Sequence, residues 1–212
     1  APAKLNLMLR IVGRRADGYH LLQTVFQFLD CGDWLWFEPR TDGTIIRASE
    51  IPGLPMDDDL TVRAARLLQR ATGSSQGATI RIVKQLPLGS GLGGGSSDAA
   101  TTLIALNHQW QAGLTLTELA ALGLTLGADV PVFIHGHAAW AEGVGERLTP
   151  VDLDQPWFLV LSPACHVATG IVFNDPELTR NSPLITIADF MTGAGGNDCE
   201  DVVYRRYPKV AA

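Results

Sequence analysis

The sequence predicts an α+β protein of two domains. Stretches of alternating apolar and polar residues, typical of strands, are interspersed with stretches whose apolar residues recur at the helical period. A chain of 212 residues is long enough to bury a sizeable core. Pro150 and Pro156 then interrupt the pattern, so we expect a boundary near residues 150–156, between a domain at 1–150 and a second at 151–212.

Eight stretches are expected to form strands. They are residues 4–12, 21–29, 34–38, 44–48, 79–84, 132–134, 138–141 and 157–161. Asp42-Gly43 is a favoured turn pair, which predicts a hairpin between the third and fourth of these strands. The tryptophans are expected to pack in the core; they are Trp34, Trp36, Trp110, Trp140 and Trp157.

Three helices are expected from their start and stop signals. The acidic residues 57–59 suit the positive end of a helix that continues to Gly73. A second helix, at residues 98–111, has one apolar face. Thr115-x-x-Glu118 is a capping box, which predicts a third helix through about residue 126.

The charge and cysteine content restrict the class of partner and the compartment. A net charge of −6 disfavours nucleic acid, whose binders usually carry a basic face. The three cysteines are far apart and odd in number, which argues against a disulfide framework and fits a reducing cytoplasm. No apolar run reaches the roughly 20 residues that a membrane-spanning helix needs. We therefore expect a cytoplasmic protein that binds a small molecule.

A glycine-rich loop at residues 87–98 joins a predicted strand directly to a predicted helix. Its sequence is Pro-Leu-Gly-Ser-Gly-Leu-Gly-Gly-Gly-Ser-Ser-Asp. Glycines let the backbone approach an anion, and the first N–H groups of the following helix point towards it. Ser90, Ser96 and Ser97 can donate hydroxyl hydrogen bonds to phosphate, and one such hydroxyl could bind Mg²⁺. A flexible linker is the alternative, but no spacer separates the loop from either element.

Comparison with the sequence motifs of known phosphate-binding loops restricts which kind of loop this is. The Walker A lysine does not follow these glycines, and the protein-kinase motifs are absent from the sequence. Gly89-x-Gly91-x-x-Gly94 matches the dinucleotide fingerprint, yet no following strand ends in an acidic residue at the ribose-binding distance. A nicotinamide-dependent oxidoreductase therefore stays an alternative, and a phosphate loop of another kind is favoured.

Residues 87–100 resemble the ATP loop of the GHMP kinases, which include galactokinase, homoserine kinase and mevalonate kinase. Residues 1–7, 15–24 and 126–133 resemble those members that phosphorylate a cytidine-diphosphate methylerythritol in the non-mevalonate isoprenoid pathway. Weaker similarity occurs at 173–178 and 197–200, so the resemblance is collinear over nearly the whole chain. It implies the two-domain GHMP kinase fold, with an N-terminal domain like ribosomal protein S5 and a ferredoxin-like C-terminal domain.

The resemblance also implies ATP as phosphoryl donor, Mg²⁺, and a catalytic pair. Asp129 would accept the proton of the substrate hydroxyl, and Lys4 would hold the attacking oxygen and offset developing charge. The other interpretation of Asp129 is structural, because an aspartate before Val130-Pro131 suits the cap of a short helix. Lys4 alone would be an ordinary lysine at the end of a strand.

Further site residues are implied by the same resemblance. Those expected to bind ATP are Asp59, Lys84, Pro87, Gly89, Ser90, Gly91, Leu92, Gly93, Gly94, Gly95, Ser96 and Ser97. Asp59 departs from the family, which has asparagine there, and a carboxylate cannot donate the hydrogen bond of an amide.

The cytidine and the methylerythritol of the substrate would contact five residues. Tyr19 and Phe173 would stack on the base, and His20 would read its hydrogen-bonding edge. Asn6 would contact the methylerythritol hydroxyls, and Thr169 would line the cytidine pocket. Without the resemblance, these residues would be assigned to the core or to loops.

The sequence departs from the family after residue 197. GHMP kinases carry a third glycine-rich stretch near the C-terminus, and the glycines at 193–196 precede the 197–200 segment instead of following it. We therefore expect an incomplete C-terminal domain in the sequence as given. Another GHMP kinase, with a homoserine or mevalonate type of substrate, and a non-catalytic nucleotide-binding module remain alternatives.

Overall fold

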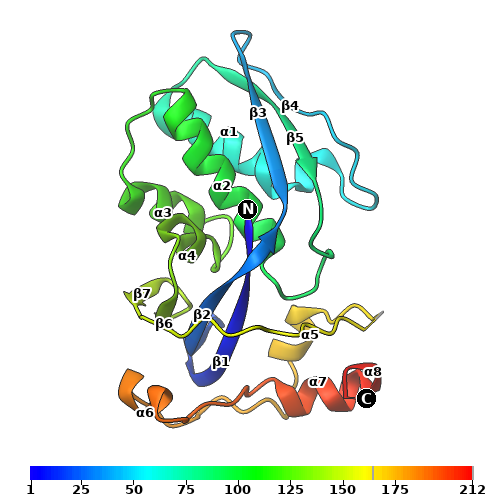
Figure 1. Cartoon of the computed structure of the whole chain (residues 1–212), viewed down its shortest axis with the longest axis vertical. Coiled ribbons are helices and arrows are strands. Elements are labelled where there is room, and N and C mark those ends of the chain that lie inside the picture. The colour runs from blue at the N-terminus through cyan, green and yellow to red at the C-terminus, as the bar shows by residue number, and fades with distance from the viewer. Residues whose placement is uncertain (164, 212) are drawn as a thin grey trace. The chain divides into compact units, whose positions relative to one another are not determined.

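The computed structural model describes residues 1–163 and 165–211 (Figure 1). The chain forms two compact units that interleave along the sequence. Unit 1 comprises Ala1–Lys4, Phe28–Leu88 and Leu92–His137, and unit 2 comprises Leu5–Gln27, Gly89–Gly91 and the described residues of Ala138–Ala212. The boundary expected at residues 150–156 stays a prediction.

A three-stranded sheet in unit 1 has the order β3-β5-β4. Strand β3 (Trp34–Arg40) pairs antiparallel with β5 (Gly77–Val83), and β4 (Ile45–Arg47) pairs parallel with the other edge of β5. The hairpin expected around Asp42-Gly43 is therefore wrong. The turn does form, because Asp42 pairs with Arg40 and accepts the Thr44 N–H at 3.1 Å, but β5 occupies the place between the two strands.

The helices of unit 1 follow from local signals. After the short 3₁₀ helix η1 (Met56–Asp58), α1 (Leu60–Thr72) is capped by the Asp59 carboxylate and ends at Gly73, whose φ is 66°. Helix α3 (Leu116–Leu124) has the expected capping box at Thr115 and Glu118. These two predictions are confirmed.

Two other elements of unit 1 differ from expectation. Helix α2 (Gly94–Gln109) begins four residues before the predicted start, so the last glycines of the loop are helical. Residues 132–134, expected as a strand, lie in α4 (Val130–His135). The β-branched and aromatic side chains there favour strands only weakly, and burial of all residues from 130 to 134 outweighs that preference.

The core of unit 1 lies where α1 packs against α2 and where these helices meet the sheet. Leu68, Ile80, Leu103 and Leu106 have no exposed surface. Trp110 is also buried, as expected, and its indole N–H donates to the carbonyl of Gly77 at 3.3 Å.

Unit 2 is built on a sheet of order β1-β2-β6-β7. Strands β1 (Pro2–Arg14) and β2 (His20–Gly32) extend into both units, and β6 (Ala139–Gly143) pairs antiparallel with β2 and with β7 (Arg147–Pro150). The later helices are α5 (Thr169–Phe173), α6 (Ile187–Met191), α7 (Glu200–Arg206) and α8 (Pro208–Ala211).

Two hydrophobic clusters stabilise unit 2. One joins Ile11 to Val172, Leu178 and Val202, and the other joins Met8 and Val25 to Trp140. Both place β1 in contact with segments far away in the sequence, as the close approach of Leu9 to Asn197 also shows. The position of β1 therefore depends on long-range packing.

Two expectations about apolar residues are corrected. Residues 157–161 form no strand in the described structure, and Trp157 and Leu159 are almost fully exposed. Trp34 and Trp36 are 60% and 41% exposed because alternate residues of β3 face the solvent side, where Arg81 lies over the ring of Trp36.

Among the described helices, none has both the length and the apolar character needed to cross a membrane.

Candidate active site

The glycine-rich loop has the geometry of an anion-binding turn. Gly89, Gly91 and Gly93 have φ values of 69°, 79° and 75°, a region that other residues adopt only with strain. Helix α2 follows at once, and no side chain caps its first turn. The first N–H groups of this 16-residue helix are consequently available to an anion, together with the positive end of the helix dipole.

Gly93 brings the loop against Lys4. The Lys4 N–H donates to the Leu92 carbonyl at 2.9 Å. A Cβ at position 93 would lie 3.0 Å from Lys4 Cγ and 2.8 Å from Phe133 Cζ, which is too close for any side chain. The sequence therefore needs glycine here both for its φ and for its lack of a side chain.

Lys4 and Asp129 form an ion pair in unit 1. The Nζ–Oδ2 distance is 3.2 Å, and the lysine side chain is 7% exposed against 34% for the aspartate. Asp129 occupies the N-cap position of α4, but its side chain accepts no capping hydrogen bond. The alternative interpretation, in which Asp129 caps a helix, is therefore right about the position of Asp129. It does not explain the carboxylate, which makes no capping hydrogen bond.

The loop serines differ in exposure. Ser97 is completely buried, and its Oγ has no hydrogen-bond partner among the described residues. Ser96 is partly exposed, and its Oγ lies 3.5 Å from where a Cβ of Gly127 would stand, two residues before Asp129. Hydroxyl and phosphate oxygens are ligands that Mg²⁺ accepts, so Ser96 fits the ion that the fold implies.

Lys84 and Asp98 flank the loop and contact each other. The Lys84 ammonium binds Asp98 Oδ2 at 2.8 Å and also binds the Asp33 carboxylate. Burial alone would lower the pKa of Lys84, but the hydrogen bonds that its ammonium donates to Asp33 and Asp98 outweigh this effect and raise that pKa. Burial raises the pKa of Asp98 to about 6 against the opposing effect of Lys84, and the charges of Asp33 and Asp59 add to the rise.

Asp59 has structural partners. Its carboxylate accepts the Thr61 N–H and hydroxyl at 2.8 and 2.7 Å and pairs with Arg47 at 2.8 Å, with both charged side chains less than 10% exposed. These contacts explain why an aspartate is stable there. A role of Asp59 in binding ATP stays a prediction.

The residues expected to bind cytidine lie in unit 2. Tyr19 is 64% exposed at a turn in which its N–H donates to Asp17. His20 is buried, and its ring centroid lies 5.1 Å from that of Phe173. The rings of Tyr19 and Phe173 make no contact with each other in the described structure. His20 and Phe173 are therefore brought together, and Tyr19 stands apart as an exposed ring.

Arg180 fixes the state of His20. Its Nε donates to His20 Nε2 at 3.1 Å, and its remaining nitrogens bind backbone carbonyls that include that of Phe173. Burial, followed by the charges of Arg180 and Arg14, lowers the pKa of His20. The imidazole is accordingly neutral, with Nε2 as acceptor and the proton on Nδ1.

Asn6 and Thr169 complete the expected set. The Asn6 amide donates to Thr24 Oγ1 at 2.8 Å, and Thr24 in turn donates to the Met8 carbonyl, which holds Asn6 against β2. Thr169 is exposed at the first turn of α5, on the same short helix as Phe173.

Asp33, Phe133 and Arg180 were not identified from the sequence. Asp33 acts on Lys84 across 51 positions, and Arg180 acts on His20 across 160. Asp33 and Arg180 lie in no motif, so the sequence offered no signal for them beyond residue type. Phe133 ends the 126–133 segment, but the resemblance implied no role for it.

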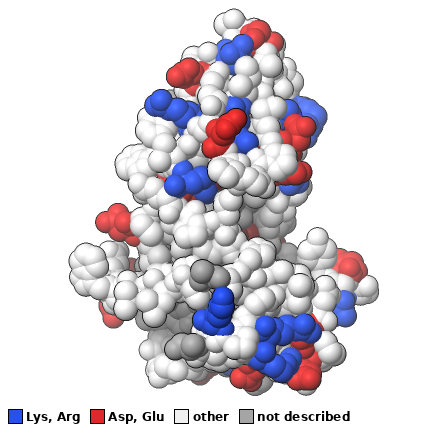
Figure 2. Space-filling view, turned by 90° about the vertical axis from the view of Figure 1, so that its right-hand side faces the viewer, with Lys and Arg blue, Asp and Glu red and all other residues white. Residues whose placement is uncertain are grey.

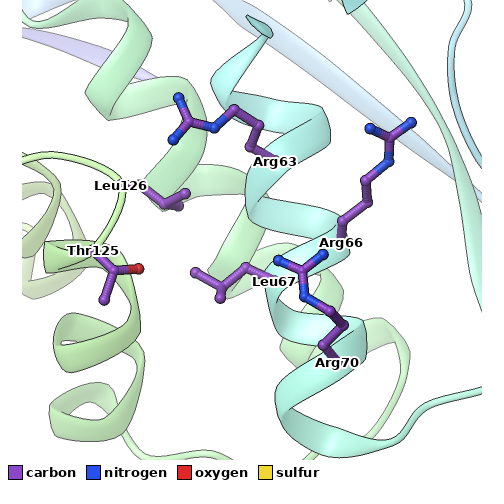
Figure 3. Close-up of a pocket in the computed structure, with 6 residues that line it drawn as sticks. All are labelled: Arg63, Arg66, Leu67, Arg70, Thr125 and Leu126. Atoms are coloured by element: carbon purple, nitrogen blue, oxygen red, sulfur yellow. The ribbon is translucent and has the colours of Figure 1, made fainter. Parts of the chain in front are cut away.

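A hollow in unit 1 lies between α1 and the C-terminal end of α3 (Figure 3). It has a volume of about 310 Å³ and is lined by Arg63, Arg66, Leu67, Arg70, Thr125 and Leu126. Arg66 pairs with Asp57 at 2.7 Å. The hollow is basic, and it contains none of the residues expected to bind ATP or substrate.

Comparison with known proteins agrees with this geometry. Residues 59–137 match the GHMP kinases N terminal domain, a match that includes the phosphate loop and Asp129. The fold and this site define a GHMP kinase, as the resemblance implied. The chain belongs, within that class, to the family of 4-diphosphocytidyl-2-C-methyl-D-erythritol kinases.

Close relatives carry that family name. A protein of Dechloromonas aromatica (strain RCB) is 61% identical over 211 residues, which are 100% of this chain and 77% of the relative. A protein of Nitrosococcus oceani is also 61% identical over 211 residues, covering 100% of this chain and 75% of the relative. Both are named 4-diphosphocytidyl-2-C-methyl-D-erythritol kinase.

A solved structure supports the fold. The crystal structure of a 4-(cytidine 5'-diphospho)-2C-methyl-D-erythritol kinase superposes with a TM-score of 0.79 at 37% identity, over 100% of this chain and 78% of that one. The predicted α+β class and GHMP kinase fold are thereby confirmed.

Proposed function

We propose that this protein transfers the γ-phosphoryl group of ATP to the 2-hydroxyl of 4-diphosphocytidyl-2-C-methyl-D-erythritol, a step of the non-mevalonate isoprenoid pathway. The observation that carries the proposal is the 3.2 Å ion pair of Lys4 and Asp129 directly beside the glycine-rich loop. An acceptor for the hydroxyl proton thus occurs in the same compact unit as the end of the loop from Leu92 onwards and the start of α2. These are the two parts that phosphoryl transfer to an alcohol requires.

Asp129 is the proposed base. Its carboxylate would take the proton from the substrate hydroxyl as that oxygen bonds to the γ-phosphorus, and the bond between this phosphorus and the β,γ-bridging oxygen breaks to release ADP. Lys4 pairs with the Asp129 carboxylate and would present its charge to the attacking oxygen. Direct transfer is the simplest course, because no residue of the site is placed as a nucleophile.

The loop is the proposed ATP site. Residues 87–97 would bind phosphate through the N–H groups at the start of α2 and through the hydroxyls of Ser90 and Ser96. Ser97 would need to turn its buried hydroxyl towards the ligand. Ser96 would hold Mg²⁺, which supplies charge neutralisation on the phosphates when bound.

Unit 2 supplies the proposed cytidine site. A neutral His20 has an Nδ1–H to offer an acceptor on the base, since Nε2 already accepts from Arg180. Tyr19 presents an exposed ring for stacking, and Phe173, together with Thr169, comes from α5. Asn6 would bind the methylerythritol hydroxyls. The reducing environment that the free cysteines suit leads us to propose the cytoplasm as the compartment.

The rate of ADP formation with different acceptor alcohols tests the proposal. ADP formation would be measured with ATP, Mg²⁺ and the cytidylylated methylerythritol, with homoserine and mevalonate as parallel acceptors. We expect rapid ADP formation with the first acceptor and only background rates with the other two. Equal rates with homoserine or mevalonate would assign a different kinase, and background rates with all three would refute kinase activity.

A further inference from the structure

One partly buried ammonium group joins the two ends of the phosphate loop. Lys84 is the first residue after β5, and Asp98 is the fifth residue of α2, so the loop runs between them. Lys84 Nζ lies 2.8 Å from Asp98 Oδ2. The strand that enters the loop and the helix that leaves it are therefore connected through a single ion pair at its base.

Asp33 anchors the same group to a third element. It stands between β2 and β3 with 3% of its surface exposed, and one of its oxygens binds Lys84. The other oxygen accepts the backbone N–H groups of Gln85 and Leu86 at 2.7 and 2.9 Å. This carboxylate thus fixes both the lysine and the two residues that directly precede the loop.

The start of α2 lies directly against this cluster. A Cβ at Gly94 would come within 3.3 Å of Asp33 Oδ2 and of Lys84 Nζ. Gly94 is the first helical residue, so its N–H belongs to the set that faces an anion. A movement of Lys84 or Asp33 would therefore displace the N–H groups that are proposed to bind phosphate.

The charges of the cluster are not balanced. Two carboxylates surround one ammonium, and Asp98 Oδ1 is buried with no hydrogen-bond donor among the described residues. Three charged groups act on Asp98: Lys84 at the end of β5, Asp33 between β2 and β3, and Asp59 at the start of α1. Asp59 is itself paired with Arg47. A buried ionic cluster of this kind is weak evidence for stability and is better explained by control of position.

We propose that Asp33 and Asp98 are positioning residues for ATP, which act by holding Lys84 and both ends of the phosphate loop in the nucleotide-binding geometry. The inference rests on the proposed function of the loop. The carboxylates of these two aspartates contact Lys84, and that of Asp33 also accepts from the backbone N–H groups of Gln85 and Leu86. Their substitution should therefore weaken ATP binding and leave binding of the alcohol substrate unchanged.

Asp33→Asn tests the first part. The dissociation constant for ATP, measured by calorimetry, should rise at least about tenfold, because the amide presents an NH₂ group to Lys84 or to the loop N–H groups. The KM for the cytidylylated alcohol should stay unchanged. The matched control is Asp57→Asn, which removes an ion-paired aspartate of the same unit at the surface and should leave both constants unchanged.

Asp98→Asn tests the second part. The dissociation constant for ATP should rise about fivefold, because an amide cannot form the ion pair that the carboxylate forms with Lys84. The KM for the cytidylylated alcohol should stay unchanged, and Asp57→Asn serves as the matched control here as well.

The outcomes separate this inference from the proposed function. If the wild type binds ATP and both variants bind it equally well, the positioning role is refuted and the function stands. If affinities for ATP and for the alcohol fall together with the free energy of unfolding, the cluster is only structural and the inference fails. If the wild type binds no ATP, the proposed function fails first. Should Asp33→Asn not fold, the dissociation constant of Asp98→Asn for ATP alone decides.

Discussion

At the scale of single residues, the environment of Asp129 suits a group that must exchange a proton. Its side chain is one-third exposed, whereas that of its partner Lys4 is buried beneath the loop. A carboxylate so placed can reach a substrate hydroxyl and can afterwards release the proton to water. Lys4 has the opposite character, because a buried ammonium depends on its partner for compensation of charge.

Asp129→Asn is expected to separate chemistry from binding. The amide has the shape of the carboxylate but cannot accept the proton, so kcat should fall by about 10²- to 10⁴-fold. The dissociation constant for ATP should change little, because the loop contacts do not involve Asp129. Rapid-quench kinetics and calorimetry measure the two quantities, and a variant that keeps its kcat would refute the assignment of Asp129 as base.

Residue roles were predictable from sequence only where a motif carried them. Lys4, Asp129 and the loop glycines were found through resemblance, and the structure brings Lys4, Asp129 and Gly93 together in unit 1. Asp33 and Arg180 act on residues far away in the sequence, and such a pair has no local signature. The burial of Ser97 was equally unpredictable, since it depends on how α2 packs.

At the scale of elements, the junction between the loop and α2 limits which residues can occupy position 93. Gly93→Ala adds strain at a φ of 75° and places a methyl group against Phe133 and Lys4. We expect a loss of about 3 kcal/mol in the free energy of unfolding, from backbone strain and overpacking together. Turnover should be lost as well, because Lys4 must move.

Gly73→Ala is the matched control for that substitution. Gly73 ends α1 with a φ of 66°, and no atom lies within 4 Å of the added Cβ. Only the backbone strain remains, so the loss should be about 1 kcal/mol, with turnover retained. Chemical denaturation compares the two, and equal losses would show that the close approach at Gly93 has no energetic effect.

Arg63→Glu is expected to stabilise α1. The helix has no acidic residue in its first turn, and Arg63 lies there with its side chain directed to the other side of the helix from that of Arg66 (Figure 3). A carboxylate at position 63 would favour the positive helix end, for a gain of about 0.5 kcal/mol in the free energy of unfolding. Arg63→Gln should give part of this gain. Turnover should not change; a loss of turnover or of stability would show that the basic hollow has a role of its own.

The ends of helices were predictable where capping residues define them. The strands were less predictable, because their arrangement depends on pairing with distant strands. Asp59, Gly73 and the capping box at Thr115 set the ends of α1 and α3 through local hydrogen bonds. The expected hairpin at residues 34–48 was wrong because β5, about 30 residues later, pairs with both strands. The strand expected at residues 157–161 was wrong because apolar residues form a strand only beside a partner strand.

At the scale of the whole molecule, the charge distribution fits a small-molecule enzyme. The net charge is −6, and on the face drawn in Figure 2 acidic and basic side chains are interspersed. No broad basic surface of the kind that nucleic-acid binders present is visible on that face.

The chain matches its relatives over its full length but spans only part of theirs. It covers 77% of the Dechloromonas aromatica protein and 78% of the solved kinase structure.

Phosphorus-31 NMR of the reaction products tests the central claim most directly. Protein, ATP, Mg²⁺ and 4-diphosphocytidyl-2-C-methyl-D-erythritol would be incubated together and the products assigned. The account predicts ADP and one new phosphomonoester on the 2-hydroxyl in equal amounts, with the cytidine diphosphate intact. ADP without that phosphomonoester, or phosphate on another hydroxyl, would contradict it.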